Sequence, residues 1–272
     1  MRFKFPITLL SAISISILIL GSLRFIPAAS MHRGWTSDET DRAPVLVELF
    51  TSEGCSDCPP ADALLEKLDR SQPVRGAEVV VLSEHVDYWN DIGWRDPYSS
   101  HEYSVRQSAF AGYFGLNSVY TPQMVVDGRI ELVGSDEHGA IQAIANAAKA
   151  EKIPVSLTSI LLEGNKTVTL HVETGPLLSS IEAESANVLV AVLDDSDESH
   201  VSRGENAGRT LTHVAVVRTL VRVGTVDKKT KFSDEVRINL AGRNSRSMRL
   251  VAFVQDETEG RIWGVALARL SN

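Results

Sequence analysis

The chain's two cysteines stand three positions apart, as Cys55-x-x-Cys58, between a strand-like segment and a helix-like one. The apolar run 45–50 before them is typical of a strand that is buried on both faces. Residues 61–68 after them carry apolar side chains at helical spacing, and a second apolar run, 79–82, follows. The order strand, cysteine turn, helix, strand predicts a βαβ unit with two parallel strands, which is the usual opening of an α/β domain.

The next part of the chain is predicted to complete that domain. An aromatic-rich excursion, residues 87–117, contains a stretch with helical character at 99–114. Residues 120–132 have the pattern of a β-hairpin, with Asp127-Gly128 as its two-residue turn. The Ala-rich segment 136–152 is predicted to be a closing helix.

Beyond Pro154 the pattern changes to strands alone. Most of the runs alternate with period two and are separated by Gly, Asn, Asp and Ser. The seven strand-like runs are Val155–Leu162, Thr167–Thr174, Val188–Leu193, Thr212–Val223, Lys231–Leu240, Arg249–Val254 and Ile262–Ala268. We therefore expect an α/β domain over residues 43–153, with a mixed sheet and flanking helices, followed by an all-β sandwich domain over 154–272.

The N-terminus has the features of an export signal. Residues 1–30 combine a basic start, an apolar stretch and a small-residue exit, as in a secretory signal peptide. The apolar stretch is long, so an uncleaved inner-membrane anchor is the alternative. Residues 31–42 are polar, lack periodicity and are interpreted as a linker. We predict a periplasmic or secreted protein, in a compartment where disulfides persist.

The charge balance excludes some partners. The first 30 residues contain three basic residues and no acidic one, which leaves 24 basic and 35 acidic residues and a net charge of −11. A chain that is this acidic is not expected to bind nucleic acid, or membranes other than through an N-terminal anchor.

The position of the cysteines favours redox chemistry. Unpaired N–H groups and a partial positive charge at a helix N-terminus stabilise a thiolate, so Cys55 is predicted to attack a disulfide. Cys58, one turn later, would then attack the mixed disulfide and release the product. Asp57 between them is expected to oppose the thiolate. A purely structural disulfide is the plainer interpretation, but closing so short a loop contributes only about 2 kcal/mol.

These residues carry a resemblance to known families. Strand, Cys-x-x-Cys, helix, strand and then Thr121-Pro122 before a hairpin resembles the thioredoxin superfamily. The sequence of residues 47–62 is similar to a secreted bacterial group, domain-of-unknown-function family 1223. It reads Val-Glu-Leu-Phe-Thr-Ser-Glu-Gly-Cys-Ser-Asp-Cys-Pro-Pro-Ala-Asp. The stretch 204–213 is also similar to that group, and the resemblance extends over roughly residues 43–270.

The resemblance implies roles for individual residues. Pro122 would be cis and would hold the substrate segment together with Thr121, and Glu48 would be a buried acid that assists proton transfer. Trp89 either lines a substrate groove or packs within its own excursion. The dithiol is itself the redox centre, so no cofactor is implied. The substrates would be protein or small-molecule thiols and disulfides, and a redox partner would regenerate the dithiol.

Two other functions use the same residues. The thiols could hold Cu(I) or Zn(II) in a metal-handling protein, with His85 or His101 as a third ligand. Alternatively, the chain could be a scaffold in which the fold is retained without catalysis. Glu205, Asn206, Arg209 and His213 form a polar group in a Gly-rich stretch. That stretch either turns the chain only or serves a ligand or interdomain contact.

Overall fold

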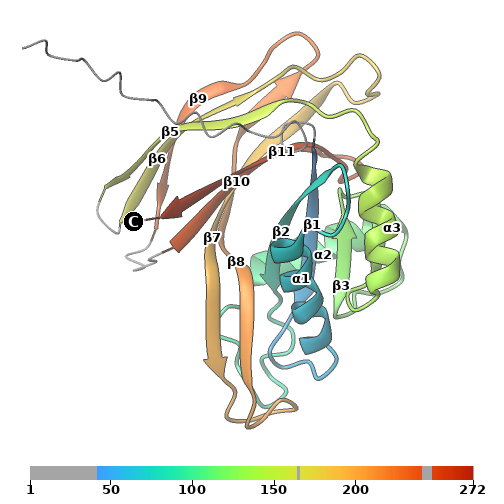
Figure 1. Ribbon diagram of the computed structural model, residues 1–272, viewed down its shortest axis with the longest axis vertical. Coiled ribbons are helices and arrows are strands. Elements are labelled where there is room, and N and C mark those ends of the chain that lie inside the picture. Colours follow the sequence, from blue (N-terminus) through green and yellow to red (C-terminus); the bar gives the residue numbers. More distant parts are fainter. Residues whose placement is uncertain (1–41, 164–165, 241–246, 272) are drawn as a thin grey trace, which may run out of the picture. The chain divides into compact units, whose positions relative to one another are not determined.

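The strand and helix order in the computed structural model begins as the sequence predicts (Figure 1). The structure describes residues 42–163, 166–240 and 247–271, and one compact unit, Ser37–Asn272, contains them all. The predicted signal or anchor and the predicted linker, except for Arg42, lie outside the described residues. Within the described part, no helix is long and apolar enough to cross a membrane.

The βαβ unit around the cysteines is confirmed. It consists of β1 (Ala43–Thr51), α1 (Pro59–Ser71) and β2 (Ala77–His85). The two strands are parallel over their whole length. Cys58 is the N-cap of α1, and two prolines occupy the first helical positions, where the missing N–H groups have no partner to lose.

The next predicted elements are also present. They are α2 (His101–Phe114), β3 (Gln123–Val126), β4 (Ile130–Val133) and α3 (Glu137–Ala147). The hairpin between β3 and β4 turns at Asp127 and Gly128, with φ of 50° and 61°. Positive φ at both positions fits the tight turn that Asp-Gly favours.

All seven strand-like runs after Pro154 are strands. They are β5 (Val155–Glu163), β6 (Thr167–Thr174), β7 (Ser185–His200), β8 (Thr210–Asp227), β9 (Ser233–Asn239), β10 (Ser247–Asp256) and β11 (Ile262–Ser271). Four of them extend the first sheet, giving one eight-stranded mixed sheet in the order β11-β10-β7-β8-β2-β1-β3-β4. The other three form a separate antiparallel sheet, β5-β6-β9.

The predicted fold class, an α/β domain followed by a separate all-β sandwich, is therefore wrong. The sheet is continuous across the junction, because β8 runs parallel to β2 with Ser83 opposite Val216. One buried apolar cluster contains Leu46 of β1 together with Leu193 of β7 and Phe253 of β10. The edge of β2 thus finds its partner in a strand more than 100 residues away, which local patterning does not reveal.

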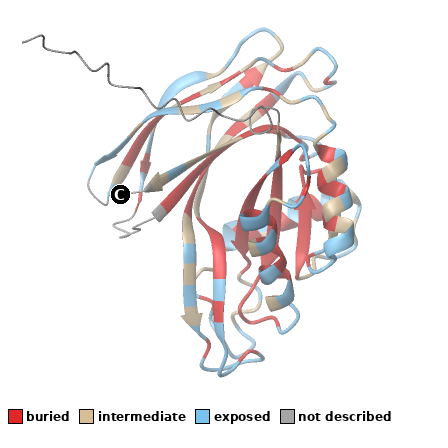
Figure 2. Cartoon of the chain, viewed as in Figure 1, coloured by how far each residue is buried: buried red, intermediate tan, exposed pale blue. Residues whose placement is uncertain are grey.

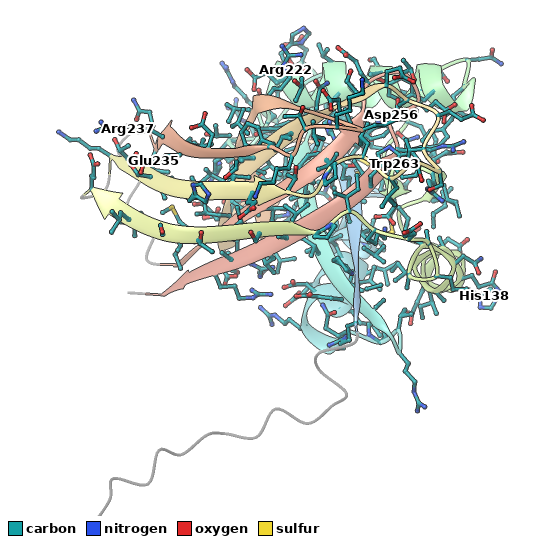
Figure 3. The ribbon with its side chains drawn as sticks, turned by 90° about the horizontal axis from the view of Figure 1, so that it is seen from above. His138, Arg222, Glu235, Arg237, Asp256 and Trp263 are labelled. Atoms are coloured by element: carbon teal, nitrogen blue, oxygen red, sulfur yellow. The ribbon has the colours of Figure 1, made fainter. Side chains whose placement is uncertain are left out.

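Apolar side chains are buried on both faces of the large sheet (Figure 2). Helices α1 and α3 pack on one face of β1 and β3, whereas α2 packs on the opposite face through Phe110 and Phe50. The three-stranded sheet covers β7 and β10, and its other side is polar: Glu235 and Arg237 on β9 are exposed (Figure 3).

Candidate active site

The two cysteines lie where the parallel strands end, which is the edge of an α/β sheet where ligand sites usually form. Cys55 is 1% exposed and Cys58 is 0% exposed, and both thiols are free. The Cys55 Sγ donates to the Thr121 carbonyl at 3.9 Å. This contact places the Thr121–Pro122 peptide bond beside the cysteine turn. The bond is cis, as predicted.

The two thiols have opposite acidities. A hydrogen bond from Cys58 outweighs burial and lowers the pKa of Cys55 from 9.0 to about 7, helped by Thr121 and by the backbone N–H groups of Asp57 and Cys58. Burial raises the pKa of the Cys58 thiol far above its ordinary value, and Cys55 and Asp62 raise it further. Near neutral pH, a substantial fraction of Cys55 is therefore the thiolate, whereas Cys58 holds its proton.

Asp57 was expected to oppose the Cys55 thiolate, but in the structure its backbone contributes the opposite effect. The residue is exposed, and its backbone N–H is one of the groups that stabilise the Cys55 thiolate. The turn that the motif adopts therefore offers a peptide N–H to the sulfur, whereas the exposed carboxylate is screened by solvent.

Thr121 and Trp89 both lie beside the cysteine turn. The Trp89 indole Nε1 donates to the Thr121 Oγ1 at 2.8 Å. Gly54 packs against the same tryptophan, since a Cβ on Gly54 would lie 3.0 Å from the Trp89 Cβ. The predicted substrate-contact residues are thus next to Cys55 in space.

Glu48, by contrast, has its contacts elsewhere. Side chains alternate along β1, so Val47 and Leu49 face α1 and α3 while Glu48 faces α2. Its carboxylate accepts from the Arg106 guanidinium at 2.7 and 2.5 Å, and Arg106 lies 3.4 Å from Glu84. We call Glu48, Glu84 and Arg106 the arginine cluster. Burial raises the pKa of Glu84 well above its ordinary value, Arg106 opposes this and Glu48 adds to it.

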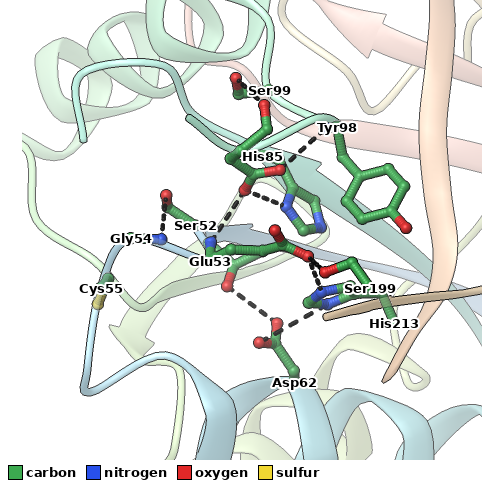
Figure 4. A network of polar contacts seen from close by, with 12 residues as sticks. Ser52, Glu53, Gly54, Cys55, Asp62, His85, Tyr98, Ser99, Ser199 and His213 are labelled. Atoms are coloured by element: carbon green, nitrogen blue, oxygen red, sulfur yellow. Dashed lines mark hydrogen bonds and ion pairs between the residues drawn. The ribbon is translucent and has the colours of Figure 1, made fainter. Parts of the chain in front are cut away.

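A second group of buried titratable residues lies on one side of the cysteine turn (Figure 4). We call it the cysteine-side cluster: Glu53, Asp62, His85, Asp96 and His213. Glu53 accepts hydrogen bonds from the Ser199 hydroxyl, from His213 Nε2 at 3.1 Å and from Trp94 Nε1 at 2.7 Å.

The other members of the cysteine-side cluster are connected to Glu53. Asp96 accepts from the Glu53 backbone N–H at 2.9 Å and contacts His85 Nδ1 at 2.7 Å. Asp62 accepts from Thr51 Oγ1 at 2.9 Å, and its other oxygen lies 3.8 Å from His213 Nδ1. The rings of His85 and His213 meet edge to face, with centroids 4.6 Å apart.

Burial and charge act in opposite directions on this cluster. Burial lowers the pKa of His213, but its hydrogen bond with Glu53 and the charge of Asp62 outweigh burial and raise it. Burial raises the pKa of Asp62, and His213 and His85 partly oppose this. Burial likewise raises the pKa of Asp96, yet His85 brings it below its ordinary value.

The loop between β7 and β8 covers the cysteine turn. Asn206 Nδ2 donates to the carbonyls of Glu53 and Cys55, both at 2.9 Å. Glu205 accepts from the Ser56 backbone N–H at 3.0 Å, and Arg209 donates to Asn206 Oδ1 at 2.9 Å. The polar stretch 204–213 therefore does more than turn the chain, since it contacts the segment that carries the cysteines.

The residues named for a metal site are engaged in other contacts. His85 Nδ1 contacts Asp96, and His101 is exposed beside Asp87 at 3.3 Å. Across the described ranges, no group of three His, Cys, Asp or Glu side chains is arranged to hold a metal ion.

Glu53, Asp62 and Asp96 were not among the residues predicted from the sequence. Asp62 comes four residues after Cys58, which places the two on one face of α1, so helical spacing alone could have identified it. Glu53 and Asp96 are recognisable only through contacts between β1, the aromatic excursion and β8.

Comparison with known proteins gives a family but no activity. A family profile described as "Protein of unknown function (DUF1223)" matches residues 46–255. The chain belongs to the DUF1223 family. No curated protein matches the sequence.

Two solved structures resemble this chain in fold. A protein of Agrobacterium tumefaciens, determined as a structural-genomics target, is 27% identical, with a TM-score of 0.63 over 85% of this chain and 96% of that one. HBP35 of Porphyromonas gingivalis is 15% identical, with a TM-score of 0.55 over 84% of this chain and 75% of that one, a likeness of fold alone. A β-glucosidase of Kluyveromyces marxianus matches 45% of this chain and 14% of its own at 8% identity, with a TM-score of 0.23 too low to carry an argument.

Proposed function

We propose that this member of the DUF1223 family is an exported thiol–disulfide oxidoreductase that uses Cys55 and Cys58. The observation that carries the proposal is the opposite acidity of two adjacent thiols. The pKa of Cys55 is lowered to about 7, whereas burial raises that of Cys58. A structural pair has no need of this asymmetry, but stepwise disulfide exchange requires one thiolate that attacks and one thiol that waits.

The reaction would proceed in two balanced steps. The Cys55 thiolate attacks a substrate disulfide, forms a mixed disulfide and expels one substrate thiolate. Cys58 then loses its proton and attacks the Cys55 sulfur, which expels the second substrate thiolate and leaves a Cys55–Cys58 disulfide. The substrate is reduced by two electrons, and a dithiol reductant from another protein would restore the enzyme.

Local geometry supports a relation to the thioredoxin superfamily as part of this proposal. The cysteine turn lies between a buried parallel strand and a helix N-terminus, with a cis-proline beside it. Thr121 and Trp89 would contact the substrate next to Cys55. Glu48 would have a structural role, because its hydrogen bonds go to Arg106.

Reduction of a protein disulfide by the purified, pre-reduced protein tests the function. We expect turnover when a dithiol such as dithiothreitol is supplied, and none from Cys55→Ser. The Cys58→Ser variant should instead accumulate mixed disulfides with its substrate, because Cys55 still attacks but nothing releases the product. Equal activity of Cys55→Ser and the wild type would refute the proposal.

A further inference from the structure

The proposed exchange leaves one proton unassigned. Cys58 is fully buried and keeps its proton near neutral pH, yet it must become a thiolate before it can attack the mixed disulfide. Because burial limits the access of solvent near neutral pH, a group inside the protein is the more effective acceptor for that proton. The identity of this acceptor depends on the proposed function and concerns the second step alone.

Asp62 is placed to accept the proton. It comes four residues after Cys58 on α1, its backbone N–H bonds the Cys58 carbonyl at 3.0 Å, and its carboxylate is buried. Residues four apart on a helix face each other. The charge of Asp62 also contributes to the raised pKa of the Cys58 thiol, as expected of a carboxylate one helical turn away.

The other buried carboxylates near the cysteines are already occupied. Glu53 accepts from three side chains, and Asp96 is in contact with His85 and two backbone N–H groups. In the described part of the chain, Asp62 accepts one side-chain hydrogen bond, from Thr51. A carboxylate has about four acceptor positions, so Asp62 retains capacity for a proton.

His213 completes the arrangement from β8. Its Nε2 is held by Glu53, and its Nδ1 faces Asp62 at 3.8 Å without a hydrogen-bond partner among the described residues. A buried polar atom without a hydrogen-bond partner costs free energy and therefore calls for an explanation. A positive charge on His213 would keep Asp62 ionised, and so able to accept a proton, at the pH where Cys58 reacts.

We propose that Asp62 accepts the proton of Cys58 when Cys58 attacks the mixed disulfide. In this step His213 orients the Asp62 carboxylate and keeps it ionised. The S–H bond of Cys58 breaks as an O–H bond forms on Asp62, and the sulfur keeps the electron pair. That pair forms the Cys55–Cys58 bond while the substrate sulfur leaves as a thiolate. Asp62 returns its proton to solvent or to the leaving thiolate.

The two steps can be separated with 5,5′-dithiobis(2-nitrobenzoate), an aromatic disulfide whose cleavage releases a coloured thiolate. One equivalent is released when Cys55 attacks, and the second when Cys58 resolves the mixed disulfide. In Asp62→Asn we expect an unchanged first release and a second release slowed roughly tenfold to hundredfold near neutral pH. The deficit should narrow as the pH rises, because hydroxide can then take the proton.

If Asp62 acted on Cys58 only through its charge, the second release in Asp62→Asn would change in the opposite direction. Because the Asp62 charge raises the pKa of Cys58, its removal would leave the second release unchanged or faster if Asp62 acted only electrostatically. That outcome overturns the proposal, and so does an equal slowing of both releases, which would indicate a packing role. The matched control is Glu66→Gln, which removes an acid one turn further along α1 and should alter neither release.

His213→Asn provides a second measurement that does not need Asp62 to be replaced. Without the imidazolium, the pKa of Asp62 should rise, so the second release should reach half its maximum at a higher pH than in the wild type. An unshifted midpoint would count against the pairing. Failure of the proposed function itself is recognisable separately, because the wild type would then show no second release that depends on Cys58.

Discussion

Two buried groups of charged side chains contact the same pair of parallel strands, and they differ in the type of cation that their carboxylates face. The arginine cluster balances Glu48 and Glu84 against a guanidinium that stays protonated at any accessible pH. The cysteine-side cluster instead pairs its carboxylates with imidazoles: His85 contacts Asp96 and His213 contacts Glu53. Of the two clusters, it is the second that lies beside the cysteine turn, through Glu53 and Asp62. A guanidinium keeps its positive charge in the core of the sheet, whereas the proposed exchange would use neighbouring groups that can gain and lose a proton.

The largest expected effect is on the fixed cluster. Arg106→Met leaves two buried carboxylates without their cation, and its side chain is only 12% exposed. We expect a loss of about 3–5 kcal/mol in the free energy of unfolding, measured in urea. The deficit should shrink at lower pH: Arg106 opposes the rise in the pKa of Glu84, so without Arg106 that pKa lies still higher and the folded variant gains more stability than the wild type as pH falls.

The exposed Arg70→Met is the control for that variant. Arg70 pairs with Glu66 at the surface of α1, so its replacement should change stability by less than about 0.5 kcal/mol. If Arg106→Met were equally mild, the arginine cluster would not be the fixed structural element that the comparison requires.

The cysteine-side region should respond in reactivity. Alkylation of Cys55 in the wild type should show a pH profile with its midpoint at about 7, slow below it as the thiol and fast above it as the thiolate. Cys58→Ala removes the hydrogen bond that lowers this pKa most, so the midpoint should rise. Near pH 7 the rate should then fall by roughly five- to tenfold, as the thiolate fraction falls. An unshifted midpoint would show that Cys58 does not control Cys55.

The same profile sharpens the comparison between clusters. The hydrogen bonds of Arg106 go to Glu48 and Gln255 and not to the cysteine turn, so Arg106→Met should keep the midpoint near 7 in the protein that remains folded. A shift there would mean that the two clusters are electrostatically connected through β1.

Sequence patterns identified the elements better than their assembly. The βαβ unit, the Asp127-Gly128 hairpin and all seven later strands are predictable from periodicity and turn residues, which are local properties. The pairing of β8 with β2 is not, because Val216 and Ser83 carry no signal of their register. An apolar strand can pair in a separate sandwich or in a continuous sheet, and only the packing of the whole chain decides between them.

The candidate site divides in the same way. Cys55, Cys58 and Pro122 could be predicted from the sequence, because the spacing of the cysteines and the residues next to all three indicate their chemistry. Glu48 was predicted to be the buried acid that assists proton transfer. Because side chains alternate along β1, its carboxylate faces Arg106 instead. Glu53 and His213 are 160 residues apart, and their contact depends on the long strand β8 that the predicted domain boundary separated from the cysteines.

The β7–β8 loop allows a test of moderate size. Asn206→Ala leaves the buried carbonyls of Glu53 and Cys55 without their common donor, which should cost about 1–3 kcal/mol in unfolding free energy. The cysteine turn should also loosen, so that Cys55 is alkylated faster at a fixed pH. A loss of stability with unchanged alkylation would show that the loop supports the fold without covering the thiol.

Glu205→Gln, in the same loop, should have the smallest effect. Glu205 is exposed, and a glutamine oxygen can still accept from the Ser56 backbone N–H. We expect no detectable change in the unfolding midpoint and less than about a twofold rise in the alkylation rate of Cys55, since solvent screens the lost charge. Any rise should vanish at high salt. A larger, salt-resistant effect would place Glu205 with the buried groups that tune the thiols, and the boundary of the cysteine-side cluster would then have to include the loop.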